Sequence, residues 1–320
     1  MIMNHNILIT SVGQRVALLR CFRETLHRFF PEAKVYATDM NTRLSPAAYI
    51  SDKCFEVLPV TDPQYISQLL RICEENEIGM IIPTIDPELL VLAENKRLFE
   101  EKGIFVSISS PEFVRRCRDK RNTGGFFKEH DIRIPECIDK NNPTFPLFAK
   151  PFDGSLSINL HSIMSEDDLS KTILKDPKLL FMEYIDGNCY KEYTVDMYYG
   201  LDHRVKSIVP RERIKVRAGE INKGMTEKEP LTNYLKERFD TIEGCVGCIC
   251  MQVFLNPETT EVIGIEINPR FGGGYPLSYV AGANYPENYI REAFLGEELT
   301  YSDDWKDHLL MLRFDDAVFV

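Results

Sequence analysis

The sequence predicts an α/β fold in which a parallel-sheet domain is followed by a C-terminal part of the α+β class. Apolar runs with the length of β-strands alternate with helix-period segments from residue 7 to residue 108. Such alternation is typical of a parallel sheet covered by helices on both faces. Beyond Ser109, prolines punctuate the chain and strand-like runs follow one another. The 320 residues are enough for two or three domains with cores of their own.

The elements of the first part can be assigned from periodicity. The turn after the first strand reads SVGQRVA and holds one glycine where a dinucleotide-binding turn needs three. Asp39 ends the second strand, where it could accept a ribose hydroxyl or cap the following loop; the poor turn favours the cap. A nicotinamide-dependent dehydrogenase is therefore a minor alternative. The predicted strands are 7–12, 34–38, 54–58, 80–84 and 104–108, and the predicted helices are 15–30, 64–76 and 87–102.

Composition excludes several classes of protein. The formal net charge of −11 argues against a nucleic-acid-binding surface, which needs a basic patch. No apolar run reaches the roughly 18 residues of a membrane span, and the first residues lack the pattern of a signal peptide. The cysteines do not suggest a disulfide framework, and we expect Cys245, Cys248 and Cys250 in a buried strand. These features predict a cytoplasmic protein without nucleic-acid or membrane partners.

The stretch VIGIEINPRFGGG, residues 262–274, is the most informative one. Its isoleucines alternate with Glu266 and Asn268, so these two oxygen-bearing side chains share one face of a strand. Hard cations are bound by such ligands. Arg270 and the glycines that follow can bring a guanidinium and backbone N–H groups to an anion. We interpret the stretch as a site for a divalent metal and a phosphate; a strand whose Glu266 faces solvent is the alternative.

A neighbouring strand supports this interpretation. Residues 250–255 and 262–268 flank the polar turn NPETTE and predict an antiparallel hairpin. If the hairpin is centred near Thr259, Gln252 lies opposite Glu266. Gln252, Glu266 and Asn268 would then cluster on one sheet face.

Two further stretches carry cations suited to anionic ligands. Lys150 ends an apolar strand and precedes a Gly/Ser loop, which suits a phosphate or a surface turn. Residues 205–217 hold five cations against one acid. At strand period Arg211 and Arg217 share a face, which suits an anionic substrate or a solvated edge strand. The preceding segment, 192–199, alternates as a half-exposed strand would.

Taken in this order, the sequence motifs resemble those of the ATP-grasp ligases, particularly the half-domains of the carbamoyl-phosphate synthase large subunit. The most specific element is Q-x13-E-x-N-P-R, present as Gln252, Glu266, Asn268, Pro269 and Arg270. In that family the Gln, Glu and Asn hold two magnesium ions that bridge ATP phosphates, and the Arg contacts the transferring phosphoryl group. The resemblance also implies that Lys120 and Lys150 bind phosphates and that Glu192 accepts hydrogen bonds from the ribose hydroxyls. It further implies a hinge whose backbone groups bind the edge of the adenine ring, formed by Glu183, Tyr184 and Ile185.

The phosphate-covering loop departs from the family pattern. That loop usually reads G-S-G-S-x-G, whereas this chain has Gly154, Ser155 and Ser157 separated by Leu156 and followed by an isoleucine and an asparagine. Fewer positions then let the backbone approach a phosphate closely.

The resemblance implies the domain limits. Residues 1–110 correspond to a Rossmann-like pre-ATP-grasp domain and 111–300 to the ATP-grasp fold. Within the latter, 111–180 form a small lid-bearing subdomain and 181–300 the metal and nucleotide subdomain; 301–320 form a tail that packs on the core. The length fits one ATP-grasp unit, so a complete carbamoyl-phosphate synthase is not expected.

These expectations predict an ATP-dependent, ADP-forming ligase that joins a small carboxylate to an amine through an acyl phosphate. It would use ATP and Mg²⁺, with Mn²⁺ as an alternative. Arg270, Arg211 and Arg217 are the predicted catalytic cations. The alternative is a regulatory ATP-binding module without turnover or, less favoured, a component of carbamoyl-phosphate synthase. A parallel-sheet domain could also support a homodimer.

Overall fold

The first domain is built on a five-stranded parallel sheet, as the alternating pattern predicted. The computed structural model describes residues 4–152, 159–217 and 219–320. In the strand order β3-β2-β1-β4-β5, every pairing is parallel. The strands are β1 (Asn6–Ile9), β2 (Val35–Asp39), β3 (Cys54–Glu56), β4 (Ile78–Ile82) and β5 (Phe105–Val106).

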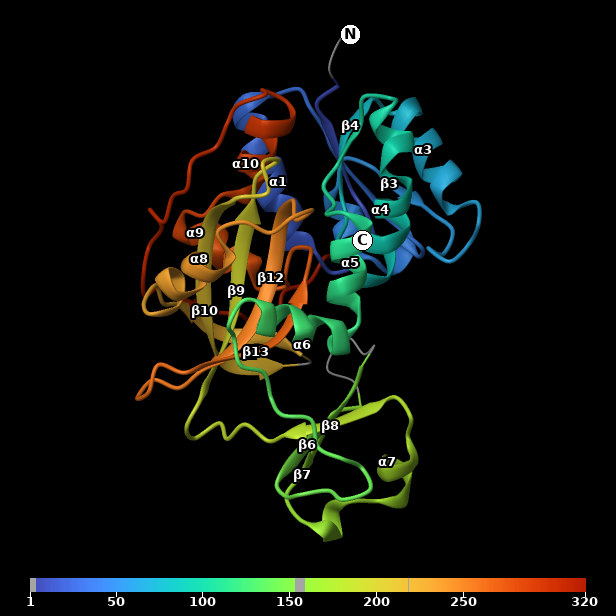
Figure 1. Cartoon of the computed structure of the whole chain (residues 1–320). Helices are drawn as coiled ribbons and strands as arrows, with labels where there is room; N and C mark the ends of the chain where they lie inside the picture. Colours follow the sequence, from blue (N-terminus) through green and yellow to red (C-terminus); the bar gives the residue numbers. More distant parts are fainter. Residues whose placement is uncertain (1–3, 153–158, 218) are drawn as a thin grey trace.

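Helices cover both faces of this sheet, so its central strands are apolar on both sides (Figure 1). Asp39, at the end of β2, accepts hydrogen bonds from the backbone N–H groups of Gly13 and Asn41, each at 2.9 Å. Its carboxylate therefore stabilises the loop after β1 and the loop after β2, which agrees with its interpretation as a cap. The helices of this domain are α1 (Val16–Phe29), the 3₁₀ turn η1 (Thr42–Leu44), α2 (Pro46–Ile50), α3 (Tyr65–Glu75) and α4 (Asp86–Glu100).

The second part is built on a six-stranded antiparallel sheet with the order β13-β12-β9-β10-β11-β14. The predicted hairpin is confirmed, because β12 pairs with β13 and Gln252 lies opposite Glu266. The last strand, β14, joins the edge of this sheet through β11. The strands are β9 (Lys191–Tyr199), β10 (Val205–Arg217), β11 (Glu220–Thr226), β12 (Gly247–Leu255), β13 (Val262–Asn268) and β14 (Leu310–Leu312).

Each face of the six-stranded sheet has its own cover. Helices α5 (Pro111–Arg118), α6 (Lys120–Glu129) and α8 (Leu231–Phe239) pack on one face, where Tyr193 and Val195 of β9 are buried. Helices α9 (Tyr275–Ala281) and α10 (Tyr285–Ala293) pack on part of the other face, over Tyr198. The prediction of a half-exposed strand at 192–199 is therefore wrong for residues 193–199, which are all buried, because helices distant in the sequence cover one face of β9 and part of the other. The alternative of a solvated edge strand at 205–217 is excluded, since β10 lies between β9 and β11.

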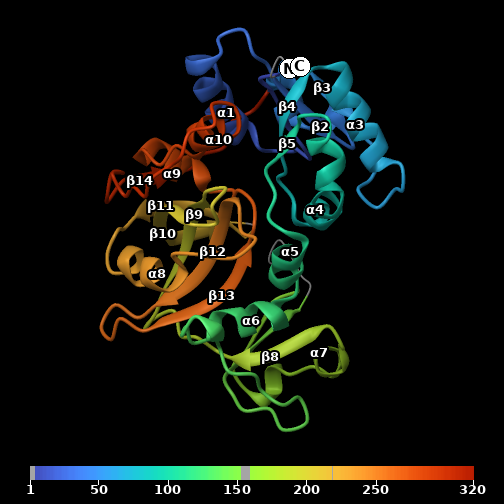
Figure 2. The same ribbon diagram turned by 45° about the horizontal axis from the view of Figure 1, so that its top comes forward.

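A small three-stranded sheet, order β7-β6-β8, lies at the opposite end of the molecule from the first domain (Figure 1). Helices α5 and α6 connect the first domain to it (Figure 2). The bounds are β6 (Leu147–Pro151), β7 (His161–Ile163), β8 (Leu179–Glu183), the 3₁₀ turn η2 (Glu166–Asp168), α5 (Pro111–Arg118), α6 (Lys120–Glu129), α7 (Lys171–Lys175), α8 (Leu231–Phe239), α9 (Tyr275–Ala281) and α10 (Tyr285–Ala293).

The first domain and the six-stranded sheet share one hydrophobic core. Helix α1 packs on α9 and α10, and the ring of Phe22 meets the ring of Phe271 edge-on at 5.5 Å between centroids. Cys248 and Cys250 are buried in β12 as predicted, whereas Cys245 is buried but precedes the strand; all three thiols are free. None of the helices in the described residues has the length and apolar character needed to cross a membrane.

Close packing of α6 on β13 gives a prediction about stability. A Cβ at Gly264 would lie 2.5 Å from the ring of Phe127, whereas a Cβ at Gly125 of α6 would meet nothing within 4 Å. We expect Gly264→Ala to lower the free energy of unfolding by about 2 kcal/mol through overpacking. Gly125→Ala, the matched control, should leave it unchanged or raise it by up to about 1 kcal/mol. Urea unfolding of both variants measures this, and equal stabilities would contradict the packing.

Candidate functional site

A cavity of about 530 Å³ lies between the six-stranded sheet and the three-stranded sheet. It opens over the part of the six-stranded sheet that α9 and α10 leave uncovered. Along β9 the side chains on this face change from the buried Tyr198 under the helices to Thr194 and Glu192 in the cavity. The sheet thus supplies an apolar surface at one end and a polar surface at the other.

The predicted cluster of Gln252, Glu266 and Asn268 lines this cavity. Asn268 Nδ2 donates to Glu266 Oε1 at 3.0 Å, and Lys120 Nζ lies 3.4 Å from Glu266 Oε2. Burial alone would raise the pKa of Glu266, but the charges of Lys120 and Lys150 and the bond from Asn268 outweigh it. The pKa of Glu266 is therefore lowered, and the carboxylate stays ionised inside the cavity.

The chemistry of these donors fits a magnesium ion only in part. Among the described residues, no group of three or more His, Cys, Asp or Glu side chains lies together as a protein-only metal site would need. One carboxylate and two amide oxygens are a sparse donor set. Mg²⁺ is commonly bound by one or two carboxylates, with water and substrate phosphates completing its octahedron. The cluster therefore fits a magnesium ion that arrives with a phosphorylated ligand.

Lys150, at the end of β6, faces the cluster from the small sheet. Its side chain is only 7% exposed. Burial and the charge of Lys120 lower its pKa to about 8, although Glu266 and Glu192 oppose the shift. Among the described residues no carboxylate forms an ion pair with this buried ammonium, which is therefore suited to an anionic ligand.

The end of the cavity near β8 holds the residues expected to bind a purine and its ribose. Glu183, Tyr184 and Ile185 line it, and the Glu183 carboxylate accepts two bonds from Arg133 at 2.6 and 2.7 Å. Glu192 lies opposite, 2.9 Å from Arg213 Nε, and burial raises its pKa. The side chain of Glu183 is thus occupied, while the backbone of this segment borders the cavity.

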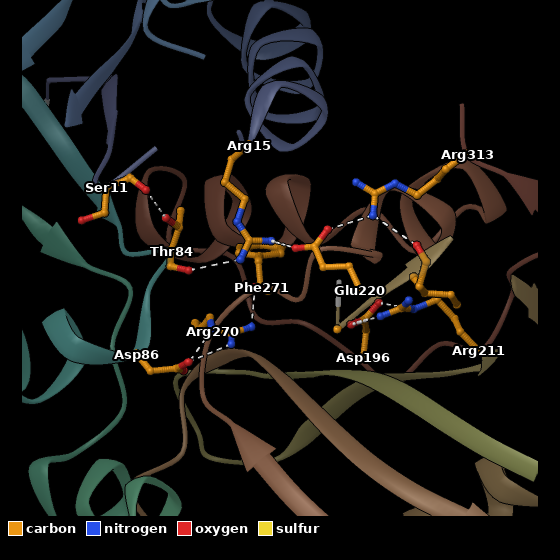
Figure 3. Close-up of polar contacts among 12 residues, drawn as sticks. Ser11, Arg15, Thr84, Asp86, Asp196, Arg211, Glu220, Arg270, Phe271 and Arg313 are labelled. Atoms are coloured by element: carbon orange, nitrogen blue, oxygen red, sulfur yellow. Dashed lines mark hydrogen bonds and ion pairs between the residues drawn. The ribbon is translucent and has the colours of Figure 1, made fainter. Parts of the chain in front are cut away.

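Arg270 joins the cluster to the first domain. Its guanidinium makes a bidentate pair with Asp86, at 3.1 and 2.9 Å, and donates to the carbonyl of Phe271 at 3.1 Å (Figure 3). Burial alone would raise the pKa of Asp86, but Arg270 outweighs it and lowers that pKa. Arg270 lines the cavity, and the carboxylate of Asp86 already neutralises its charge.

The two arginines predicted from β10 lie in different places. Arg211 is fully buried and makes a bidentate pair with Asp196, at 2.8 and 2.9 Å, while its Nη1 has no hydrogen-bond partner within the described part of the chain. Arg217 pairs with Asp315 and lies outside the residues that line the cavity. The expected single basic face is wrong, because the register shifts twice between Glu212 and Val216. The predicted Gly154, Ser155 and Ser157 lie outside the described residues.

Sequence reasoning missed Arg15, Asp86 and Glu220, of which Arg15 and Glu220 line the cavity. A signal existed for two of them. Arg15 lies in the loop after β1, and Asp86 begins the helix that follows β4. Ligands of open parallel sheets bind at the carboxyl ends of strands, so polar residues at these positions were candidates.

Family models match most of the chain in two segments. Residues 7–107 match the N-terminal domain of the PylC-like proteins. Residues 175–315 match the ATP-grasp domain described as belonging to a biosynthetic pathway with the Ter operon. No curated protein sequence matches the chain.

Solved structures share the fold over nearly the whole chain. N5-carboxyaminoimidazole synthetase from Staphylococcus aureus, complexed with ADP, has 15% identity and a TM-score of 0.69, covering 96% of this chain and 79% of the synthetase. The L-amino acid ligase from Bacillus licheniformis has 16% identity and a TM-score of 0.66, covering 95% of this chain and 77% of the ligase. The biotin carboxylase domain of Hydrogenobacter thermophilus 2-oxoglutarate carboxylase, in complex with MgADP, ADP and bicarbonate, has 16% identity and a TM-score of 0.68. The match covers 94% of this chain and 72% of that domain.

The chain therefore contains a PylC-like N-terminal domain at residues 7–107 and an ATP-grasp domain at residues 175–315. The resemblance inferred from the sequence is confirmed at this level. The closer likeness to carbamoyl-phosphate synthase stays a prediction.

The pair between Asp86 and Arg270 gives a second prediction. Asp86→Asn should lower the free energy of unfolding by about 3 kcal/mol, because it leaves the charge of Arg270 buried and uncompensated. The double variant with Arg270→Met should recover part of that loss. Urea unfolding of the two single variants and the double variant measures the coupling. Strictly additive effects would show that the pair does not stabilise the junction between the domains.

Proposed function

We propose that the protein is an ATP-dependent, ADP-forming ligase that joins a carboxylate to an amine. The observation that carries this proposal is the convergence of Lys120, Lys150, Glu266, Asn268 and Gln252 on one cavity. Two lysines beside one carboxylate and two amides suit a polyphosphate with its magnesium ions. The ATP-grasp fold and the ADP present in the similar synthetase support the choice of nucleotide.

The proposed roles follow the positions of the side chains. Lys120 and Lys150 bind the phosphates, and Glu192 accepts the ribose hydroxyls. The backbone groups of residues 183–185 form hydrogen bonds with the edge of the adenine ring. Magnesium held by Gln252, Glu266 and Asn268 would neutralise phosphate charge. Arg270, at the far side of the cluster, contacts the γ-phosphoryl group as it transfers.

The reaction proceeds in two displacements. A substrate carboxylate oxygen attacks the γ-phosphorus of ATP, the bond to the β–γ bridging oxygen breaks, and ADP leaves with that electron pair. The amine then attacks the acyl carbon, the acyl–oxygen bond breaks, and inorganic phosphate leaves while the amine loses a proton. Because little covalent chemistry falls to the protein, its contribution is positioning and charge neutralisation.

Removal of the central carboxylate tests this proposal. Glu266→Ala should abolish carboxylate-dependent ADP release, because the magnesium-bearing phosphates lose their only anionic protein ligand in the cluster. A coupled ADP assay measures it, with Glu258→Ala in the exposed hairpin turn as control. Near-normal turnover of Glu266→Ala would contradict the metal assignment. Nucleotide affinity without turnover in the wild type, for any carboxylate–amine pair, would favour a regulatory binding module.

The lowered pKa of Lys150 predicts the pH dependence of nucleotide binding. The protonated ammonium binds phosphate, and its pKa in the free protein is about 8. Affinity for ADP should therefore be highest below that pH and fall roughly tenfold between pH 7 and pH 9 as the proton is lost. Isothermal titration calorimetry measures this. Lys150→Arg keeps its charge throughout this range, so its affinity should vary much less; equal slopes would refute the role of Lys150.

A further inference from the structure

Arg15 is a cation of the cavity whose hydrogen-bonding capacity is largely unused. It lies in the loop after β1, and four-fifths of its side chain is buried. A guanidinium has five N–H donors. Among the described residues the guanidinium of Arg15 makes one long hydrogen bond, from Nη2 to the carbonyl of Thr84 at 3.4 Å, and its Nη1 lies 3.9 Å from Glu220 Oε1 (Figure 3). Charge-assisted bonds between arginine and carboxylate are normally about 2.7–2.9 Å.

The other described arginines that line the cavity differ from Arg15 because each has a carboxylate partner at close range. Arg270 and Arg211 each have a bidentate carboxylate partner, and Arg213 lies 2.9 Å from Glu192. Burial lowers the pKa of Arg15, and the nearby charge of Arg270 lowers it further. An anion placed between these two guanidiniums would relieve their repulsion and use the donors that Arg15 has left.

Glu220 brings the opposite charge to the same end of the cavity. Its carboxylate accepts a bond from Arg313 at 2.8 Å. It lies so close to the glycine turn that a Cβ at Gly273 would be 2.2 Å from Oε1. Because Gly273 has no side chain, Glu220 has room to line the cavity beside Arg15.

We propose that Arg15 and Glu220 together recognise an α-amino acid, which serves as the acyl donor of the ligase reaction. The α-carboxylate binds between Arg15 and Arg270, and the α-ammonium binds Glu220. This inference rests on the proposed ligase function and names its substrate class. A dicarboxylate would place its second charge against Glu220, and a simple carboxylate would leave Glu220 without a ligand.

The arrangement has a chemical consequence. The α-carboxylate beside Arg270 lies where the γ-phosphoryl group is expected, so this carboxylate is the one activated. Glu220 keeps the α-amine protonated, and an ammonium has no lone pair with which to attack an acyl phosphate. The bound amino acid is thereby protected from acylating a second copy of itself.

Trapping with hydroxylamine tests this substrate class without knowledge of the natural amine. Hydroxylamine attacks the acyl phosphate, inorganic phosphate leaves, and a hydroxamate forms that ferric chloride detects. Common α-amino acids are compared, one by one, with the carboxylic acid that lacks the α-amino group, in the presence of ATP and MgCl₂. We expect at least one amino acid to exceed its deaminated partner by about tenfold or more in kcat/KM.

Variants assign the discrimination to the two side chains. Glu220→Gln should reduce the preference for the amino acid over its deaminated partner to less than about threefold. Arg15→Gln should raise KM for the amino acid by about tenfold or more, and Arg15→Lys by less. Arg20→Gln, at an exposed position on the helix α1 that begins directly after Arg15, is the matched control and should change neither. Calorimetric affinity for ADP should be the same in all of these variants, which shows that they are folded.

The outcomes separate the two proposals. Failure of every acid to release ADP would overturn the ligase function itself. Turnover in which deaminated acids serve as well as amino acids, or in which Glu220→Gln keeps the full preference, would overturn only the amino-acid inference.

Discussion

The buried ion pair between Asp196 and Arg211 is the interaction on which the geometry of the site depends. Both side chains are fully buried, and their two hydrogen bonds join β9 to β10. Ser278 of α9 donates to the same carboxylate at 2.6 Å, and the hydroxyl of Tyr285 donates to the backbone carbonyl of Asp196. The pair therefore lies where the helices that cover the sheet end and the cavity begins. A buried charge must be paired, so sheet and helices are held in one arrangement.

From this boundary the two ends of the sheet take different roles. Toward α9 and α10 the sheet face is apolar and joins the core of the first domain, which fixes the loop carrying Arg15 against the site. Toward the small sheet the same face presents Glu192, Gln252 and Glu266 to the cavity. The proposed nucleotide end is thus built within the ATP-grasp fold, whereas the proposed substrate end draws on both domains.

Local patterns were enough to predict much of this arrangement. The register of the hairpin followed from its turn, which placed Gln252 opposite Glu266, and the alternation of strands and helices gave the parallel sheet. Lys150 could be placed because an apolar strand ends there.

What could not be predicted depends on contacts between distant segments. One face of β9 is buried by α5 and α6, which precede it, and by α8, and the other face is buried by α9 and α10, some 80 residues later. The partner of Arg211 is Asp196, 15 residues earlier on a neighbouring strand, so a row of arginines at strand period did not reveal which of them is neutralised. Arg15 meets Glu220 only because the first domain packs on the second. Such pairings require the tertiary fold.

A crystal structure of the protein grown with ADP and MgCl₂ tests the central claim most directly. The account predicts ADP in the cavity between the six-stranded and three-stranded sheets, with its phosphates at Lys120 and Lys150 and its adenine beside residues 183–185. Magnesium is expected between the phosphates and Glu266. Nucleotide bound elsewhere, for example at the turn after β1, would contradict it.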